Sequence, residues 1–132
     1  MNHPPFVEHC AELLSPLGAV RVRRMFGGWG LYADGLFIAI IAFERLYLKT
    51  SPDSHERFIT AGGEPFRYLA HGREVALGYC TAPAEALDSP ALMAPWARLA
   101  LQAALAARAK ATARVKPPAR ATRPPAAKAR RG

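Results

Sequence analysis

Acidic residues are missing from the C-terminal part of this 132-residue chain, since none follows Asp88. Residues 1–107 hold nine basic and ten acidic residues, whereas residues 108–132 hold nine basic residues and no acidic one. These nine are Arg108, Lys110, Arg114, Lys116, Arg120, Arg123, Lys128, Arg130 and Arg131. The charge distribution indicates an anionic partner for the basic segment, while a nearly neutral body must explain any other function.

Cysteine is scarce, and long hydrophobic runs are missing. The 2 cysteines, Cys10 and Cys80, form no CxxC motif and no disulfide framework. The longest apolar run, residues 36–43, is too short to span a membrane, and the N-terminal residues lack the pattern of a secretory signal. We therefore expect a cytoplasmic protein without a membrane partner and with reduced thiols, a disulfide between the two cysteines being the less favoured alternative.

Apolar periodicity and turn residues predict a single α+β domain over residues 1–107. The expected strands lie near residues 20–23, 29–33, 36–43, 46–50, 66–69 and 74–79. The expected helices cover residues 5–14, a short stretch between the capping residues 51–54 and Gly62, and a stretch from residue 89 or 95 to about residue 110. The order helix, three or four strands, helix, two strands, helix favours two layers with a mostly antiparallel sheet.

Turn residues and apolar stripes add details to this fold. Asp34-Gly35 predicts a type I′ hairpin, and Glu44-Arg45 is the expected site of the next turn. On the last helix, the expected buried stripe is Leu92, Trp96, Leu99 and Ala103, and Pro95 should kink or start that helix. The aromatic residues expected in the core are Trp29, Tyr32, Phe37, Tyr47, Phe66 and Trp96.

Residues 108–132 are predicted to form a disordered basic arm. They are rich in alanine, proline, lysine and arginine, and they hold too few large apolar residues to fold. Lysine and arginine neutralise phosphates and release counterions, which predicts non-specific binding of DNA or RNA. The arm has no aromatic residue to stack on bases and no apolar anchor for a membrane. A solubilising arm without a dedicated partner is the alternative.

Three groups of residues in the body suggest chemistry, and each also has a structural interpretation. The glycines of residues 27–30 precede a strand and lack the lysine of a phosphate-binding loop, which favours a tight corner of the backbone. The cysteines and histidines lack the spacing of a metal site, which favours cysteines in the core. Arg21, Arg23 and Arg24 could contact phosphates, but protection of an edge strand by charge is favoured. We expect no catalytic residue, metal or cofactor.

Several motifs of the chain resemble the N-terminal domain of the TfoX/Sxy family. The residues that carry the resemblance are 24–32, Asp34-Gly35, 46–49, Phe58, Ala61-Gly62, 64–68, Gly72-Arg73, Ala82-Pro83 and 95–98. The resemblance covers roughly residues 5–107. It implies a small α+β domain with no known catalytic site, in a family whose better-known members regulate bacterial natural competence as transcriptional co-activators. Those members carry a second, helical C-terminal domain, and here a basic arm stands in its place.

These observations lead to a hypothesis of a non-enzymatic regulatory or interaction module. Its basic arm would hold it near nucleic acid, and its body would bind an unidentified protein partner, in a role accessory to transcription or competence. The alternative is a small ligand-binding or enzymatic domain with a solubilising tail. In that alternative, residues 27–30 and Arg67 or Arg73 would line a pocket.

Overall fold

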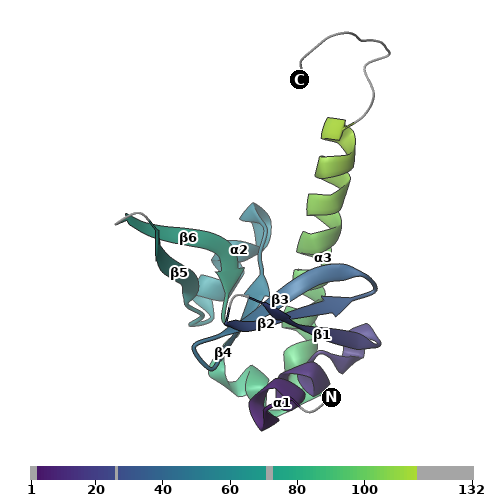
Figure 1. Ribbon diagram of the computed structural model, residues 1–132, viewed down its shortest axis with the longest axis vertical. Helices are drawn as coiled ribbons and strands as arrows, with labels where there is room; N and C mark the ends of the chain where they lie inside the picture. The colour runs from purple at the N-terminus through teal and green to yellow at the C-terminus, as the bar shows by residue number, and fades with distance from the viewer. Residues whose placement is uncertain (1–2, 26, 71–72, 116–132) are drawn as a thin grey trace, which may run out of the picture.

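The computed structural model describes residues 3–25, 27–70 and 73–115 (Figure 1). The strands are β1 Val20–Met25, β2 Gly28–Ala33, β3 Leu36–Ala42, β4 Arg45–Lys49, β5 Pro65–Ala70 and β6 Arg73–Cys80. The α-helices are α1 Pro5–Leu13, α2 Pro52–Thr60 and α3 Pro90–Val115, and short 3-10 helices cover η1 Ser15–Leu17 and η2 Ala84–Asp88. This order confirms the predicted α+β class.

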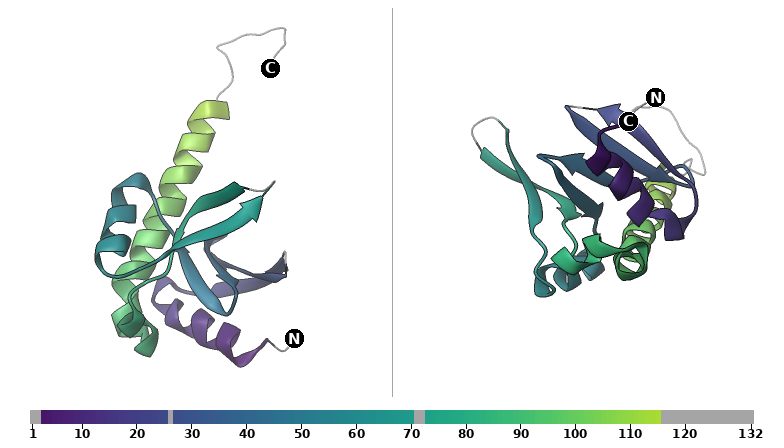
Figure 2. Two further views of the ribbon diagram at one scale, coloured as in Figure 1. Left: turned by 90° about the vertical axis from the view of Figure 1, so that its left-hand side faces the viewer. Right: turned by 90° about the horizontal axis from the view of Figure 1, so that it is seen from below.

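The six strands form one antiparallel sheet in the order β1-β2-β3-β4-β6-β5. Within the described residues, α1, α2 and α3 all contribute to the main core, which packs against one face of the sheet. The left view of Figure 2 shows α2 and α3 together on one side of the strands. A second cluster of buried residues lies on the opposite face and contains residues of β3, β4, β5 and β6 only. The domain therefore has two layers, and the described helices cover one face of the sheet.

Two local signals are confirmed in detail. Asp34 and Gly35 connect β2 to β3 with φ angles of 54° and 78°, as a type I′ turn requires. Ser51 caps α2, because its hydroxyl oxygen accepts a hydrogen bond from the Ser54 backbone N–H at 3.2 Å, while the Ser51 N–H donates to the Ser54 hydroxyl oxygen at 2.9 Å. Both features depend on residues close in sequence.

The turn between β3 and β4 lies one residue earlier than predicted. Phe43 and Glu44 form it, with φ angles of 55° and 58°, whereas the sequence placed Phe43 in the strand and the turn at Glu44-Arg45. The apolar run that includes Phe43 caused the error, because periodicity assigns a large apolar side chain to the strand. In the structure this side chain is 73% exposed.

The buried stripe of α3 differs from the predicted one. The residues that face the main core are Met93, Ala97, Ala100 and Ala104. Ala103 is buried as predicted, but Leu92 is 48% exposed, and Trp96 and Leu99 are half-buried. Small side chains on this face let the helix backbone approach the sheet closely. The distance between the helix and the sheet, and not the size of the side chains, therefore determines which face of α3 is buried.

The two ends of α3 also differ from expectation. The helix starts at Pro90 and runs through Pro95, and the Ser89 hydroxyl accepts a hydrogen bond from the Leu92 N–H at 3.2 Å. It continues to Val115, beyond the predicted end at residue 110, so residues 108–115 are helical and not a disordered arm. Alanine, which has the highest helix propensity, accounts for this extension. The predicted disorder of residues 116–132 lies outside the described residues.

The predicted core aromatics divide between the two faces of the sheet. Tyr47 and Phe66 are buried in the second cluster, with Phe37 packed against them. Trp29 and Trp96 are half-buried against the main core, and Tyr32 is half-buried beside Phe37, with ring centroids 5.1 Å apart. Four of these six aromatics, Tyr32, Phe37, Tyr47 and Phe66, therefore belong to a face that no described helix covers.

Candidate functional site

The uncovered face of the sheet carries a hollow of about 640 Å³. We call it the sheet hollow. It lies between the β1–β2 turn, β3, the β3–β4 turn and the β5–β6 pair, and its lining residues are Met25, Gly27, Gly28, Phe37, Ile40, Ile41, Ala42, Phe43, Phe66 and Tyr79. On β3, Phe37, Ile40 and Ala42 pack on this side of the sheet, whereas Leu36, Ile38, Ala39 and Ile41 belong to the main core. A register shift in the pairing of β2 with β3 interrupts the strict alternation and leaves Ile38 and Ala39 both on the helix side. Among the residues that the structure describes, none with a charged side chain lines the hollow.

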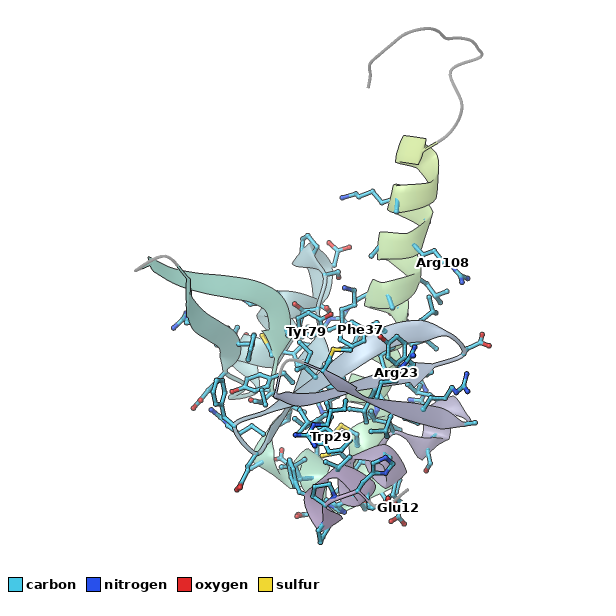
Figure 3. All side chains as sticks on the ribbon, in the orientation of Figure 1. Glu12, Arg23, Trp29, Phe37, Tyr79 and Arg108 are labelled. Atoms are coloured by element: carbon cyan, nitrogen blue, oxygen red, sulfur yellow. The ribbon has the colours of Figure 1, made fainter. Side chains whose placement is uncertain are left out.

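Aromatic rings pack edge to face along this surface. The ring centroids of Phe37 and Tyr79 are 6.0 Å apart, and Figure 3 shows these two side chains close together. Tyr47 and Phe66 are 4.8 Å apart with their planes at 70°. Because the rings cover one another, Tyr47, Phe66 and Tyr79 are only 5–9% exposed. The floor of the hollow is thus a preformed apolar surface.

The glycines at residues 27–30 form the corner that borders the hollow. Gly27 has a φ of 76°, which favours glycine. A Cβ on Gly28 would collide with the backbone carbonyl of Ile41, and a Cβ on Gly30 would lie 2.6 Å from Phe37 and 2.7 Å from Met25. Close approach of strands and side chains therefore requires these glycines, in agreement with their structural interpretation.

Phe43 forms part of the rim of the hollow in an unusual conformation. A positive φ is rare for a bulky residue and carries a strain of about 1–2 kcal/mol. The Phe43 ring stacks on Phe66, with centroids 6.3 Å apart and planes at 27°, yet 73% of the residue is exposed. The β3–β4 turn thus holds a large apolar ring in solvent beside an apolar hollow.

Cationic side chains lie around the hollow on the same face. Lys49 lies over the Tyr79 ring at 5.2 Å. Arg21 and Arg23 are exposed on β1, opposite Tyr32 and Gly30 of β2, and neither forms an ion pair with another described residue.

Arg45 differs from these cations, because it pairs with Glu64 at 2.8 Å and lies over the Tyr47 ring at 5.6 Å. Its hydrogen bond to Glu64 raises the pKa of the Arg45 guanidinium. Three cations on this face, Arg21, Arg23 and Lys49, therefore remain without an acidic partner among the described residues.

The three arginines of β1 separate onto two faces. Arg24 lies over the Trp29 ring at 5.2 Å, on the helix side, where Trp29 also contacts His3. Figure 3 shows Trp29 near α1, away from Phe37 and Tyr79. Because β1 is an edge strand, its charges fit the predicted protection of an edge, and Arg21 and Arg23 also border the uncovered face.

The basic segment begins on the outer half of α3. Residues 105–111 of this helix are exposed, and the helix extends beyond the sheet (Figure 1). Arg108 and Lys110 therefore project into solvent, and Arg114 lies on the last turn of the helix. The other predicted residues, Lys116, Arg120, Arg123, Lys128, Arg130 and Arg131, lie outside the described residues.

The structure brings one cysteine and one histidine together. The Sγ of Cys80 and the Nδ1 of His55 are 3.5 Å apart. The sequence does not predict this pair, because the two positions lie 25 residues apart along the chain and no local motif connects them. Burial raises the pKa of Cys80, opposed by the charge of Arg67, and the thiol is 0% exposed. A reactive cysteine needs a lowered pKa and an accessible thiol, so this pair lacks the properties of a nucleophile.

No cluster of ligands suggests a metal. Among residues 3–25, 27–70 and 73–115, no group of three or more histidine, cysteine or acidic side chains could hold an ion. Arg67, which the ligand-binding alternative placed in a pocket, does not line the sheet hollow, and the side chain of Arg73 lies outside the described residues.

Both thiols should resist chemical modification while the protein is folded. Cys10 and Cys80 are 0% exposed, and burial raises the pKa of Cys10 from 9.0 to about 12. We expect negligible reaction with a chromogenic disulfide reagent at pH 8, and also at pH 10, where unfolded thiols are ionised but the folded Cys10 stays protonated. In denaturant the same reagent should titrate 2 thiols per chain. Rapid labelling of either thiol in the folded protein would contradict this description.

The part of the chain that the structure describes includes a long helix, α3, of 26 residues. Neither α3 nor any other described helix combines the length and apolar character that crossing a bilayer requires.

A family model described as the TfoX N-terminal domain matches residues 12–104. The match includes the sheet, α2 and the buried half of α3, and it ends before Arg108. No curated protein matches the chain.

Proposed function

This chain belongs to the TfoX N-terminal domain family, and on this premise we propose a non-enzymatic regulatory protein that associates with nucleic acid through residues 108–132. The family is not a known family of enzymes, and it suggests a regulatory role of the kind found in competence. We place the protein in the cytoplasm, as an accessory to transcription whose body binds a protein partner.

The observation that carries the nucleic-acid proposal is the position of the basic segment. It contains nine lysine and arginine residues without an acidic one, and its first residues lie on a helix that leaves the body. At about 1.5 Å per residue, residues 105–115 extend this helix by roughly 15 Å. Arg108 and Lys110 can therefore reach phosphates without displacing any part of the domain.

The chemistry of this segment favours contacts to the sugar-phosphate backbone. It has no aromatic side chain for stacking and no asparagine or glutamine for adenine, so its lysines and arginines supply affinity more than sequence recognition. Any choice of site on nucleic acid would then come from the protein partner.

The sheet hollow supports the non-enzymatic part of the proposal. Tyr79 is the one titratable side chain among its described lining residues, and burial raises the pKa of Tyr79 to about 12. General acid–base catalysis works best with a pKa near the working pH, so this phenol is a poor proton donor or acceptor at neutral pH.

A salt titration tests the nucleic-acid proposal. If the full chain contacts about five phosphates, log K against log salt should have a slope near −4.5, a loss of about 500-fold in affinity between 50 and 200 mM salt. Substitution of all nine basic residues by glutamine should abolish binding to a generic duplex. Unchanged binding by this variant, or no binding by the native chain near physiological salt, would contradict the nucleic-acid proposal. The basic segment would then serve to solubilise the protein.

Two double variants that carry the same total charge provide a matched comparison. R108Q with K110Q removes two charges from the outer half of α3, and R57Q with R98Q removes two exposed charges from α2 and from the packed half of α3. We expect the first pair to make the slope shallower by about 1.8 and the second pair to leave it unchanged. Equal effects would show that net charge, and not the basic segment, determines binding.

A further inference from the structure

We propose that the sheet hollow binds an acidic segment of a partner protein, with a large apolar side chain of that segment in the hollow. The acidic residues around this anchor would face Arg21, Arg23 and Lys49. This inference rests on the proposed function for the existence of a protein partner, but it does not depend on binding of nucleic acid.

The shape and lining of the hollow suit an apolar anchor. Its volume of about 640 Å³ lies within the range of roughly 300–1,000 Å³ typical of binding pockets. Its described walls are Met, Phe, Ile, Ala and Gly, and of the lining residues in the described part of the chain Tyr79 alone carries a hydroxyl. Met25 adds a flexible side chain that can adapt to different anchors.

Phe43 supplies the second argument. Its ring is 73% exposed at a positive φ of 55°, so the residue carries both backbone strain and unfavourable hydration. A partner side chain between Phe43 and the floor of the hollow would remove that ring from water. Aromatic residues at the centre of an interface commonly provide much of its affinity.

The packing of the rings argues against a nucleic-acid base as the occupant. A stacking platform needs several exposed ring faces, but Tyr47, Phe66 and Tyr79 are 5–9% exposed and pack edge to face, which leaves Phe43 as the exposed ring beside the hollow. The polar edges of a base would also lose hydrogen bonds to water, and the described lining residues offer one side-chain hydroxyl in exchange.

Charge complementarity then selects an acidic partner. Arg23 lies two residues before Met25 on the same face of β1, and Lys49 lies over Tyr79, so cations border the hollow on two sides. Arg45 is already neutralised by Glu64. The same cations would repel the basic residues 108–132 of this chain, which makes that segment a poor occupant.

Fluorescent twelve-residue peptides with one central tryptophan, phenylalanine or leucine provide the probe. The flanks contain either glutamate and glycine or lysine and glycine, and a third set has alanine at the centre. Binding to the full chain is measured by fluorescence anisotropy at 150 mM salt. We expect the best glutamate peptide to bind at least tenfold more tightly than both its lysine and its alanine counterparts.

Two variants with matched controls locate the binding site. F43N removes the ring and retains a residue that tolerates positive φ, and L105N removes an exposed apolar side chain from α3. R23E reverses a charge beside the hollow, and R108E makes the same change on α3. F43N and R23E should each weaken the glutamate peptide at least fivefold, and both controls should stay within twofold of the native chain.

Four results would overturn the proposal. The first is that no peptide binds up to 1 mM, and the second is that lysine peptides bind as tightly as glutamate peptides. The third is that R108E lowers the affinity for the glutamate peptide as much as R23E does. The fourth is that single-stranded oligothymidylate displaces the peptide from the native chain and that F43N weakens this displacement. The last result would assign the hollow to a nucleic-acid strand. F43N and R23E should leave the salt slope for duplex binding almost unchanged, so this proposal and the proposed function can fail separately.

Discussion

Replacement of Phe58 by alanine should lower the free energy of unfolding by about 4 kcal/mol. Phe58 on α2 is 0% exposed, and the centroid of its ring lies 4.9 Å from the ring centroid of Trp96 on α3. The substitution removes a large buried side chain and leaves a cavity at the junction of two helices, for which losses of about 3–5 kcal/mol are typical. Urea denaturation followed by circular dichroism measures the change.

The neighbouring residue provides the control for this prediction. Ile59 belongs to the same helix but is 37% exposed, so I59A should cost about 1 kcal/mol or less. If F58A and I59A destabilised the protein equally, the packing of α2 against α3 described above would be wrong.

Replacement of Gly28 by alanine should lower the free energy of unfolding by about 2–3 kcal/mol. The added Cβ would collide with the backbone carbonyl of Ile41 on the paired strand. Backbone atoms within a sheet cannot move aside as a flexible side chain can, so the cost is that of overpacking. Thermal or urea denaturation measures this loss, and a lowered affinity for the glutamate peptide should accompany it because Gly28 lines the sheet hollow.

Gly78 offers a matched control on β6. A Cβ at Gly78 would lie 3.6 Å from the Thr50 carbonyl oxygen, an ordinary van der Waals contact. G78A should therefore leave stability unchanged or raise it by a few tenths of a kcal/mol, because alanine restricts the unfolded chain. A cost for G78A as large as that for G28A would contradict the account of close approach at Gly28.

The predictable features of the fold depend on short-range chemistry. Asp34-Gly35 produced the expected turn, and Ser51 produced the expected helix cap, because each is determined by a few adjacent residues. On β4, Leu46 and Leu48 lie in the main core and Tyr47 lies in the second cluster, as the two-residue period of a strand requires. The backbone geometry of such a local pattern is determined by the adjacent residues themselves. It can therefore be predicted without knowing the order of the strands in the sheet.

The features that were missed depend on distant parts of the chain. The buried face of α3 depends on how closely the helix approaches β3 and β4, so alanines displaced Leu92 from the predicted stripe. Phe43 left its predicted strand because the turn lies one residue earlier.

The sheet hollow follows from the order of six strands together with the lack of a described helix on that face. Composition and periodicity do not specify either property. The contact between His55 and Cys80 likewise joins two elements that are neighbours only in three dimensions.

α3 is one continuous helix, so its packed half and the start of the basic segment lie along the same helix axis. Residues 93–104 of this helix are packed under the sheet, and the following residues extend from it without a break. Packing against the sheet already stabilises the buried turns of the helix. The outer turns therefore form by adding residues to an existing helix, without a further free-energy cost of nucleation. The helix therefore holds the backbone of Arg108 and Lys110 at a fixed position and in a fixed direction relative to the sheet. A strand of nucleic acid that contacts them would have a defined orientation relative to any protein on the opposite face, although no base is read.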